Sequence, residues 1–182
     1  MIEAFHREFL PSEPVQLAIK TGMPGADKDA LYENVIGQVM DLKASIGLYS
    51  DVNLYKPEFL ITEPLSQEGV WQLHKMCHCF VMPSSCESMN RPAIEAMMFG
   101  NQVISTSALP GANFHDIIPP KDATKMLKER GRNSVVPHVS IKPLMEAMRL
   151  AYSLREQSSP TMKFSGFGYK NMGEKIERAL WM

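Results

Sequence analysis

Short apolar segments alternate along this chain with longer segments whose apolar residues recur at helical spacing. The expected strands are residues 15–20, 59–61, 79–82 and 103–105, with a weaker one at 135–136. The expected helices carry the apolar stripes Ile2, Phe5 and Phe9; Leu31, Val35, Val39, Leu42 and Ile46; Val70, Leu73 and Cys77; Ile141, Leu144, Met148 and Tyr152; and Met172, Ile176 and Leu180. Asp27 or Asp29 and Ser66 are expected to cap two of these helices. Such alternation predicts right-handed crossovers and an α/β fold with three layers around a parallel sheet.

The segment from residue 79 to residue 100 says most about function. A buried strand closed by Pro83 leads into a polar loop, and a short helix then begins near Arg91 and stops at Gly100. Such a unit directs unpaired backbone N–H groups at the carboxyl edge of the sheet, where an anionic group can be held. Glu87 and Glu95 stand eight residues apart beside that edge, and two carboxylates suit neutral hydroxyl groups better than a second phosphate. A phosphate-linked sugar is a ligand that needs both features.

These residues resemble the motif of the retaining GT-B glycosyltransferases of family 4, in their carboxyl-terminal, donor-binding half. The matching positions are, in order, Pro83-Ser84, Glu87, Pro92, Glu95-Ala96-Met97, Gly100 and the strand Gln102-Val103-Ile104-Ser105-Thr106. Weaker similarity extends over most of the chain. The resemblance implies a Rossmann-like three-layer α/β/α parallel sheet forming one half of a GT-B enzyme, which transfers a sugar from a nucleotide sugar to an acceptor. It also implies that no metal and no other cofactor is required.

The resemblance also implies roles for individual residues. Glu87 would be the catalytic residue that touches sugar hydroxyls near the reacting carbon, and Glu95 would accept hydrogen bonds from the ribose hydroxyls of the donor. The remaining donor-binding residues would be Ser88, Met89, Asn90 and Arg91.

Each of these residues also has a plainer interpretation. Glu95 could be a favourable charge near a helix start, although the capping-box role is excluded because its N-cap position would be Pro92. Glu87 could be a solvated loop acid, and Arg91 could be an ordinary surface residue.

A binding module without catalysis is the competing hypothesis for the whole chain. Ser88-Met89-Asn90 occupies a place where the family usually has two glycines, whose backbone approaches the donor closely. The Arg and Lys that the family uses for the donor diphosphate would precede Met1, as would the acceptor domain.

We therefore expect residues 1–160 to form a nucleotide-sugar-binding domain. Residues 161–182 are expected to form a closing helix that reaches toward a missing amino-terminal acceptor domain, or through which the chain self-associates. Residues 119–133 are expected to form a surface excursion that is partly helical at 123–128.

Composition excludes several other classes. A net charge of −1 gives no electrostatic reason to expect nucleic-acid binding, and no apolar run approaches the roughly 18 residues of a membrane span. The absence of a signal-type segment and the odd number of cysteines, three, predict a cytoplasmic protein with reduced thiols.

A zinc site could be imagined from His74, Cys77, His78, Cys79 and Cys86. The spacing of these residues lacks a paired Cys-x-x-Cys, so we expect core thiols and no metal.

Overall fold

The structure is a computed structural model of the 182-residue chain, and it describes residues 1–22, 25, 27–83, 91–105, 115–116, 124–129, 132–137 and 140–157. The helices are α1 (Ile2–Glu8), α2 (Lys28–Ile46), α3 (Gln67–Met76), α4 (Arg91–Met98) and α5 (Ile141–Ser153), with 3-10 turns η1 (Val52–Leu54) and η2 (Arg155–Gln157). The strands are β1 (Ala18–Lys20), β2 (Phe59–Ile61), β3 (Cys79–Met82), β4 (Gln102–Ser105), β5 (His115–Asp116), β6 (Thr124–Glu129) and β7 (Arg132–Pro137). The expected closing helix at 161–182 lies outside the described residues.

The caps that begin and end these helices are largely those that the sequence indicates. The Asp27 side chain accepts a hydrogen bond from the Ala30 amide at 2.9 Å, and α2 ends at Gly47 with φ +65°. The side chain of Ser66 accepts from the Gly69 amide at 3.2 Å and so caps α3. Both predicted caps are therefore confirmed.

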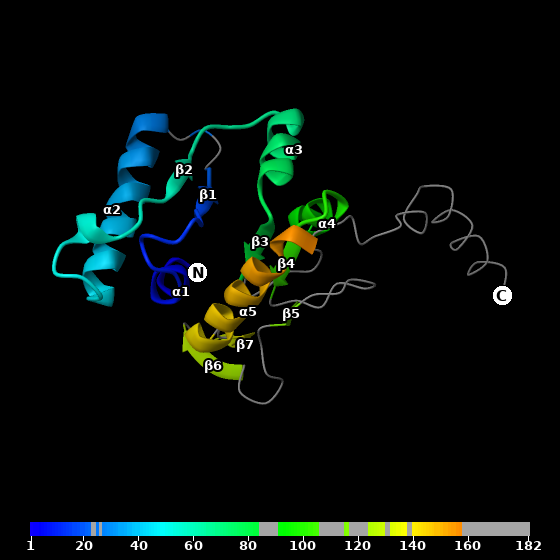
Figure 1. Ribbon diagram of the computed structural model, residues 1–182. Coiled ribbons are helices and arrows are strands. Elements are labelled where there is room, and N and C mark those ends of the chain that lie inside the picture. The colour runs from blue at the N-terminus through cyan, green and yellow to red at the C-terminus, as the bar shows by residue number, and fades with distance from the viewer. Residues whose placement is uncertain are drawn as a thin grey trace.

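The described strands form three separate sheets. β1 pairs in parallel with β2, β3 with β4 and β4 with β5, whereas β6 and β7 form an antiparallel hairpin. Figure 1 shows β1 and β2 beside α2, and β3 and β4 nearer α4 and α5. The sequence predicted a parallel sheet, and the structure shows its strands in two short parallel sheets.

Helices cover both faces of the β3–β4 pair. Successive residues of a strand point to opposite faces, and the register pairs Phe80 with Val103 and Val81 with Ile104. Val81 and Ile104 face a core built with α1 and α5, whereas Phe80 and Val103 pack against α4. This part of the chain therefore has the three layers that the sequence predicted.

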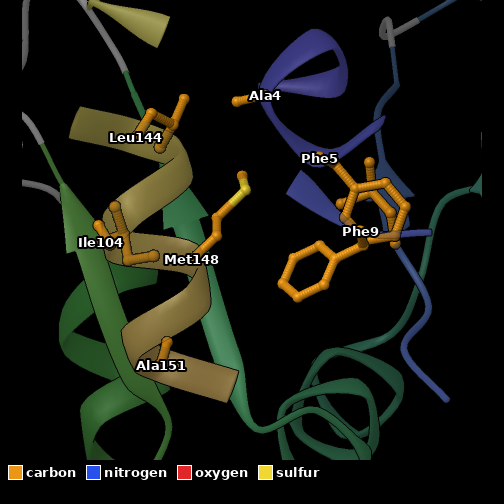
Figure 2. Packing of buried hydrophobic residues seen from close by; sticks show 9 residues of the cluster. Ala4, Phe5, Phe9, Ile104, Leu144, Met148 and Ala151 are labelled. Carbon is orange, nitrogen blue, oxygen red and sulfur yellow. The ribbon is translucent and has the colours of Figure 1, made fainter. Parts of the chain in front are cut away.

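The larger core lies between α1, α5 and β4. Its fully or nearly buried members include Ala4, Phe5, Phe9, Ile104, Leu144, Met148 and Ala151, which Figure 2 labels. The α1 stripe faces α5, and Ile104 lies against the buried face of α5. Burial of these apolar side chains therefore holds α1 against α5.

Arg149 links α5 to α1 at the edge of this core. Its Nε donates to Glu8 Oε1 at 2.6 Å and its Nη1 to Glu13 Oε2 at 2.6 Å, while its guanidinium lies 4.4 Å from the ring centroid of Phe9. The hydrogen bond from Arg149, together with one from the Leu10 amide, lowers the pKa of the Glu13 carboxyl to about 2.

One predicted element is wrong. Residues 123–128, expected to be partly helical, fall largely within strand β6, which pairs antiparallel with β7 from Thr124↔Pro137 to Glu129↔Arg132. Residues of β6 such as Met126, Leu127 and Lys128 favour a helix by themselves, but pairing with β7, which contains the β-branched Val135 and Val136, outweighs that local propensity.

No helix within the described residues is both long and apolar enough to cross a membrane.

Candidate functional site

The candidate site is formed where α4 follows β3. β3 ends at Met82, Pro83 follows it, and α4 begins at Arg91. α4 therefore returns over the sheet from the carboxyl edge of β3, the edge at which ligands of parallel sheets bind. Four predicted site residues, Glu87, Ser88, Met89 and Asn90, lie outside the described residues, so the expected shared cleft for Glu87 and Glu95 stays a prediction.

Small side chains bring α4 close to the sheet. Ala93 and Ala96 are completely buried, Met97 nearly so, and all three pack with Val103 of β4. Gly100, with φ +83°, turns the chain from α4 into β4, a conformation that favours glycine. These contacts fix the position of α4, and with it that of Glu95.

Arg91 and Glu95 form an ion pair along α4. Arg91 Nε donates to Glu95 Oε1 at 3.0 Å, the favourable i,i+4 spacing of a helix. The Arg91 side chain is 78% exposed and that of Glu95 only 18%. An ion pair with so exposed an arginine contributes little to stability. The residues that bury most of the Glu95 side chain therefore affect its position more than Arg91 does.

The residues at the end of α4 pack against the end of α3. Phe99, four residues after Glu95, stacks on the His74 ring with centroids 5.9 Å apart and planes at 8°. His74 is buried, and its backbone oxygen accepts a hydrogen bond from Asn101 Nδ2 at 2.9 Å. Burial lowers the pKa of the His74 imidazole, and this effect is partly opposed by the Asn101 side chain and by the negative charge of Glu95.

The sequence did not single out His74 beyond naming it among five imagined zinc ligands, and nothing near it in the sequence indicates its contact with Phe99. A buried histidine at the end of a helix becomes informative only when the facing helix is known.

The cysteines near the site have the character of core thiols. Burial raises the pKa of the Cys79 thiol to about 12, the nearby Cys77 adds to that rise, and burial also raises the pKa of Cys77. Cys79 packs against the larger core, as predicted; Cys86 lies outside the described residues. No group of three or more potential His, Cys, Asp or Glu ligands occurs within the part of the chain that the structure describes.

A second cluster of charged groups, also missed by the sequence, joins α1, α2 and the residue before β2. Glu58 Oε1 is hydrogen-bonded by His6 Nε2, and Glu58 Oε2 accepts from Lys43 Nζ at 2.7 Å. The three side chains are 2–9% exposed. The Tyr55 hydroxyl donates to the Lys43 backbone oxygen at 3.0 Å. Lys43 and Glu58 also line a pocket between α2 and β2, but each carboxylate oxygen already has a protein partner. We interpret this cluster as a structural connection.

Comparison with known proteins bears on the segment around α4. Residues 48–129 match the model of the family described as Glycosyl transferases group 1. The match covers a little under half of the chain, and it includes β3, residues 84–90 and α4. Searches of curated proteins and of solved structures found no match. The predicted resemblance to glycosyltransferases is thus confirmed for residues 48–129.

Proposed function

We propose that this chain is the donor-binding domain of a retaining glycosyltransferase of GT-B fold and family 4, acting on a nucleotide sugar. The observation that carries the proposal is the family match at residues 48–129, because it encloses the strand–loop–helix unit with both glutamates. The geometry of that unit is compatible with it, since α4 starts directly beyond the carboxyl end of β3. Both lines of support concern the same short stretch of chain.

In this proposal the charge of the donor diphosphate is stabilised without a metal. The amide groups at the start of α4 and the Arg91 side chain lie at the edge where an anion would be held. Arg91 is highly exposed, so it can leave Glu95 for a phosphate oxygen at small cost. Glu95 would then accept hydrogen bonds from the ribose hydroxyls, and Glu87 would contact the sugar near the reacting carbon.

The proposal can be tested by protection against thermal unfolding. UDP-glucose, GDP-mannose and ADP-glucose would each be added to the chain and to its Glu95→Gln variant. Losing one charge-assisted hydrogen bond weakens binding by about 1.5–3 kcal/mol, or roughly ten- to a hundredfold, so Glu95→Gln should need correspondingly more ligand. Glu68→Gln, on the exposed first turn of α3, is the matched control and should bind as the unmodified chain does. Equal protection of Glu95→Gln and the unmodified chain would exclude the ribose role.

A non-catalytic nucleotide-sugar-binding module is the second candidate. The observation that favours it is Ser88-Met89-Asn90, where the family motif usually has two glycines. Because the donor-binding domain alone is not expected to transfer sugar, turnover of a nucleotide sugar has to be measured with this chain joined to an acceptor domain. A non-catalytic module would bind the donor there without consuming it. If turnover is found, Glu87→Gln should depress it.

A further inference from the structure

β2 has a free edge on the side away from β1. Within the described part of the chain β2 pairs only with β1, and the two strands are parallel. The Phe59 amide donates to the Leu17 backbone oxygen at 2.9 Å, and the Ile61 backbone oxygen accepts from the Thr21 amide at 3.0 Å. Because the backbone groups of successive strand residues point to opposite edges, the N–H and C=O of Leu60 point away from β1. We call this side of the strand the outer edge of β2.

The side of α2 next to the outer edge is apolar. Tyr32, Ile36 and Met40 follow one another at intervals of four residues, so they lie on one side of the helix. Together with Pro57 and Leu60 they line a recess between α2 and β2, and no described residue of β1 lines it. Tyr32 and Met40 are nevertheless 41% and 43% exposed. The recess therefore offers apolar surface to the side chains of a further strand at the outer edge.

Phe59 adds an exposed aromatic ring on the other face of β2, where it is 59% exposed. Side chains alternate along a strand, so Phe59 and Ile61 point to the face opposite Leu60. An edge strand with exposed apolar residues and unpaired backbone groups is a template for pairing with another chain. The far edge of β1 differs, because Ile19 of β1 packs in the same core as Val81 of β3 and that side lies toward the rest of the chain (Figure 1).

We propose that two copies of this chain associate through β2, with the two β2 strands antiparallel about a two-fold axis at Leu60. Leu60 then lies opposite Leu60 of the second copy, and the two residues exchange both of their N–H···O bonds. Phe59 lies opposite Ile61 of the second copy, and such a pair of an aromatic and a β-branched residue stabilises a sheet. The segment is therefore its own complement, as a two-fold interface requires.

The charges beside β2 favour this antiparallel register over a parallel one. Two acids, Glu58 and Glu63, flank the strand. In the proposed register Glu58 lies opposite Thr62 and Glu63 lies opposite Pro57 of the second copy, so no like charges meet. A parallel pairing in register would place each glutamate beside its own equivalent, which is unfavourable. Pro57 and Pro64 bound the segment and keep the pairing short.

The surface that is available implies a weak dimer. Phe59, Tyr32 and Met40 are 59%, 41% and 43% exposed, which corresponds to roughly 300 Å² per copy for side chains of about 200 Å² each. The two copies together contribute roughly 600 Å² from these side chains, half of the smallest standard interface of about 1,200 Å². We therefore expect a dimer that forms only at high protein concentration, with a Kd on the order of 100 µM.

The association leaves the candidate site free. It involves α2 and β2, whereas the candidate site lies at the carboxyl end of β3 and at α4. The inference therefore does not depend on the proposed function, and donor binding by the monomer would not contradict it.

Amide hydrogen exchange tests the strand edge without any substitution. Exchange of the β2 amides would be followed by NMR at protein concentrations from about 50 µM to about 1 mM. The Leu60 amide should become more protected as the dimer forms, whereas the amides of Phe59 and Ile61, which face β1, should keep the same protection throughout. A Leu60 amide whose exchange is independent of concentration overturns the inference.

Sedimentation equilibrium over the same concentrations tests the association itself. The unmodified chain should pass from monomer toward dimer. Phe59→Lys should lower the association constant by about tenfold or more, because it removes two apolar cross-strand pairs from each dimer. Leu10→Lys replaces a residue of similar exposure, 62%, beyond the end of α1 and should associate as the unmodified chain does. A monomer at every concentration, or an equal effect of the two substitutions, overturns the inference.

A pair of opposite substitutions tests the two-fold register. Leu60→Lys and Leu60→Glu each place like charges opposite one another across the axis, so each variant alone should associate more weakly than the unmodified chain. An equimolar mixture should associate more tightly than either variant alone, since opposite charges then meet. A mixture of folded variants that associates no more tightly than either one overturns the proposed register.

Two further results keep the inference open to refutation. Circular dichroism and urea unfolding show whether both Leu60 variants fold, and if one does not, the comparison of Phe59→Lys with Leu10→Lys decides. Association that Phe59→Lys leaves undiminished would occur through another surface, such as residues 161–182, and would overturn the inference as a whole.

Discussion

Replacing Glu58 by Gln should destabilise the protein strongly, because Glu58 is the common partner of two buried groups. Its carboxylate accepts hydrogen bonds from His6 on α1 and Lys43 on α2, and its side chain is 5% exposed. The amide introduced by the substitution could still bond one of these groups, but the Lys43 ammonium would remain buried without a counter-charge. Breaking a buried ion pair from one side costs about 3 kcal/mol or more, which in a domain of this size lowers Tm by roughly 6–12 °C.

The same contacts give the prediction a pH signature. Burial alone would raise the pKa of the Glu58 carboxyl, but the hydrogen bonds from His6 and Lys43 outweigh burial and hold that pKa below its usual value of 4.5. The folded state therefore gains stability from ionised Glu58 above about pH 4.5, and loses it as pH falls through the lowered pKa. Glu58→Gln removes this part of the acid sensitivity.

Urea unfolding at pH 7 and at pH 3.5 measures both effects. We expect Glu58→Gln to cost less at pH 3.5 than at pH 7. The double variant Lys43→Met/Glu58→Gln should be more stable than Glu58→Gln at pH 7, since it no longer buries an unpaired cation. Glu63→Gln, an exposed acid just beyond β2, is the control and should change little. A Glu58→Gln variant as stable as the unmodified protein at pH 7 would refute the assigned network.

Three further predictions concern other parts of the fold. Arg149→Met should raise the pKa of the Glu13 carboxyl from about 2 toward its ordinary value. An unchanged titration of this carboxyl by NMR would contradict the hydrogen bond between Arg149 of α5 and Glu13. Cys79, whose thiol pKa is raised to about 12 by burial, should resist iodoacetamide at pH 8 in the folded protein and react once unfolded, and rapid native labelling detected by mass spectrometry would disprove its burial. Gly47→Ala should destabilise the protein by about 1 kcal/mol, because φ is +65° at the end of α2; an equally stable variant in urea unfolding would show that this cap relaxes freely.

Local sequence signals predicted the helices well, because the backbone hydrogen bonds and caps of a helix join residues that are close together in the sequence. The α2 region shows this clearly: Asp27 caps its start and Gly47 ends it, as the residue types favour. Its buried face was harder to predict. The apolar stripe correctly included Val39, which is buried, and Leu42, which is half-buried, but it did not include Lys43, the other buried residue of α2. The partners that allow a lysine to be buried come from α1 and from Glu58, and no pattern within α2 reveals them.

Strand pairing was predicted less well, for a related reason. β1 and β2 have three residues each, so a correct strand assignment leaves few pairs from which its neighbours can be inferred. The sequence placed a strand at residues 15–20, and the structure confines β1 to Ala18–Lys20, beside β2. Which sheet a short strand joins depends on contacts between distant segments, and these are not encoded in its own alternation.

Glu95 shows how the two kinds of information combine at the candidate site. Sequence alone predicted that it lies on a short helix after a buried strand; the structure confirms the helix and the strand, and β3 is half-buried along its length. What surrounds its carboxylate depends on α3 and on the turn before β4, which meet α4 only in the folded chain. The fully buried Ala93 and Ala96 set the distance of α4 from the sheet, while Phe99, just beyond α4, stacks on His74 of α3. The environment of this glutamate is therefore set by packing on two faces of one helix, and a change on either face should alter how it meets a ligand.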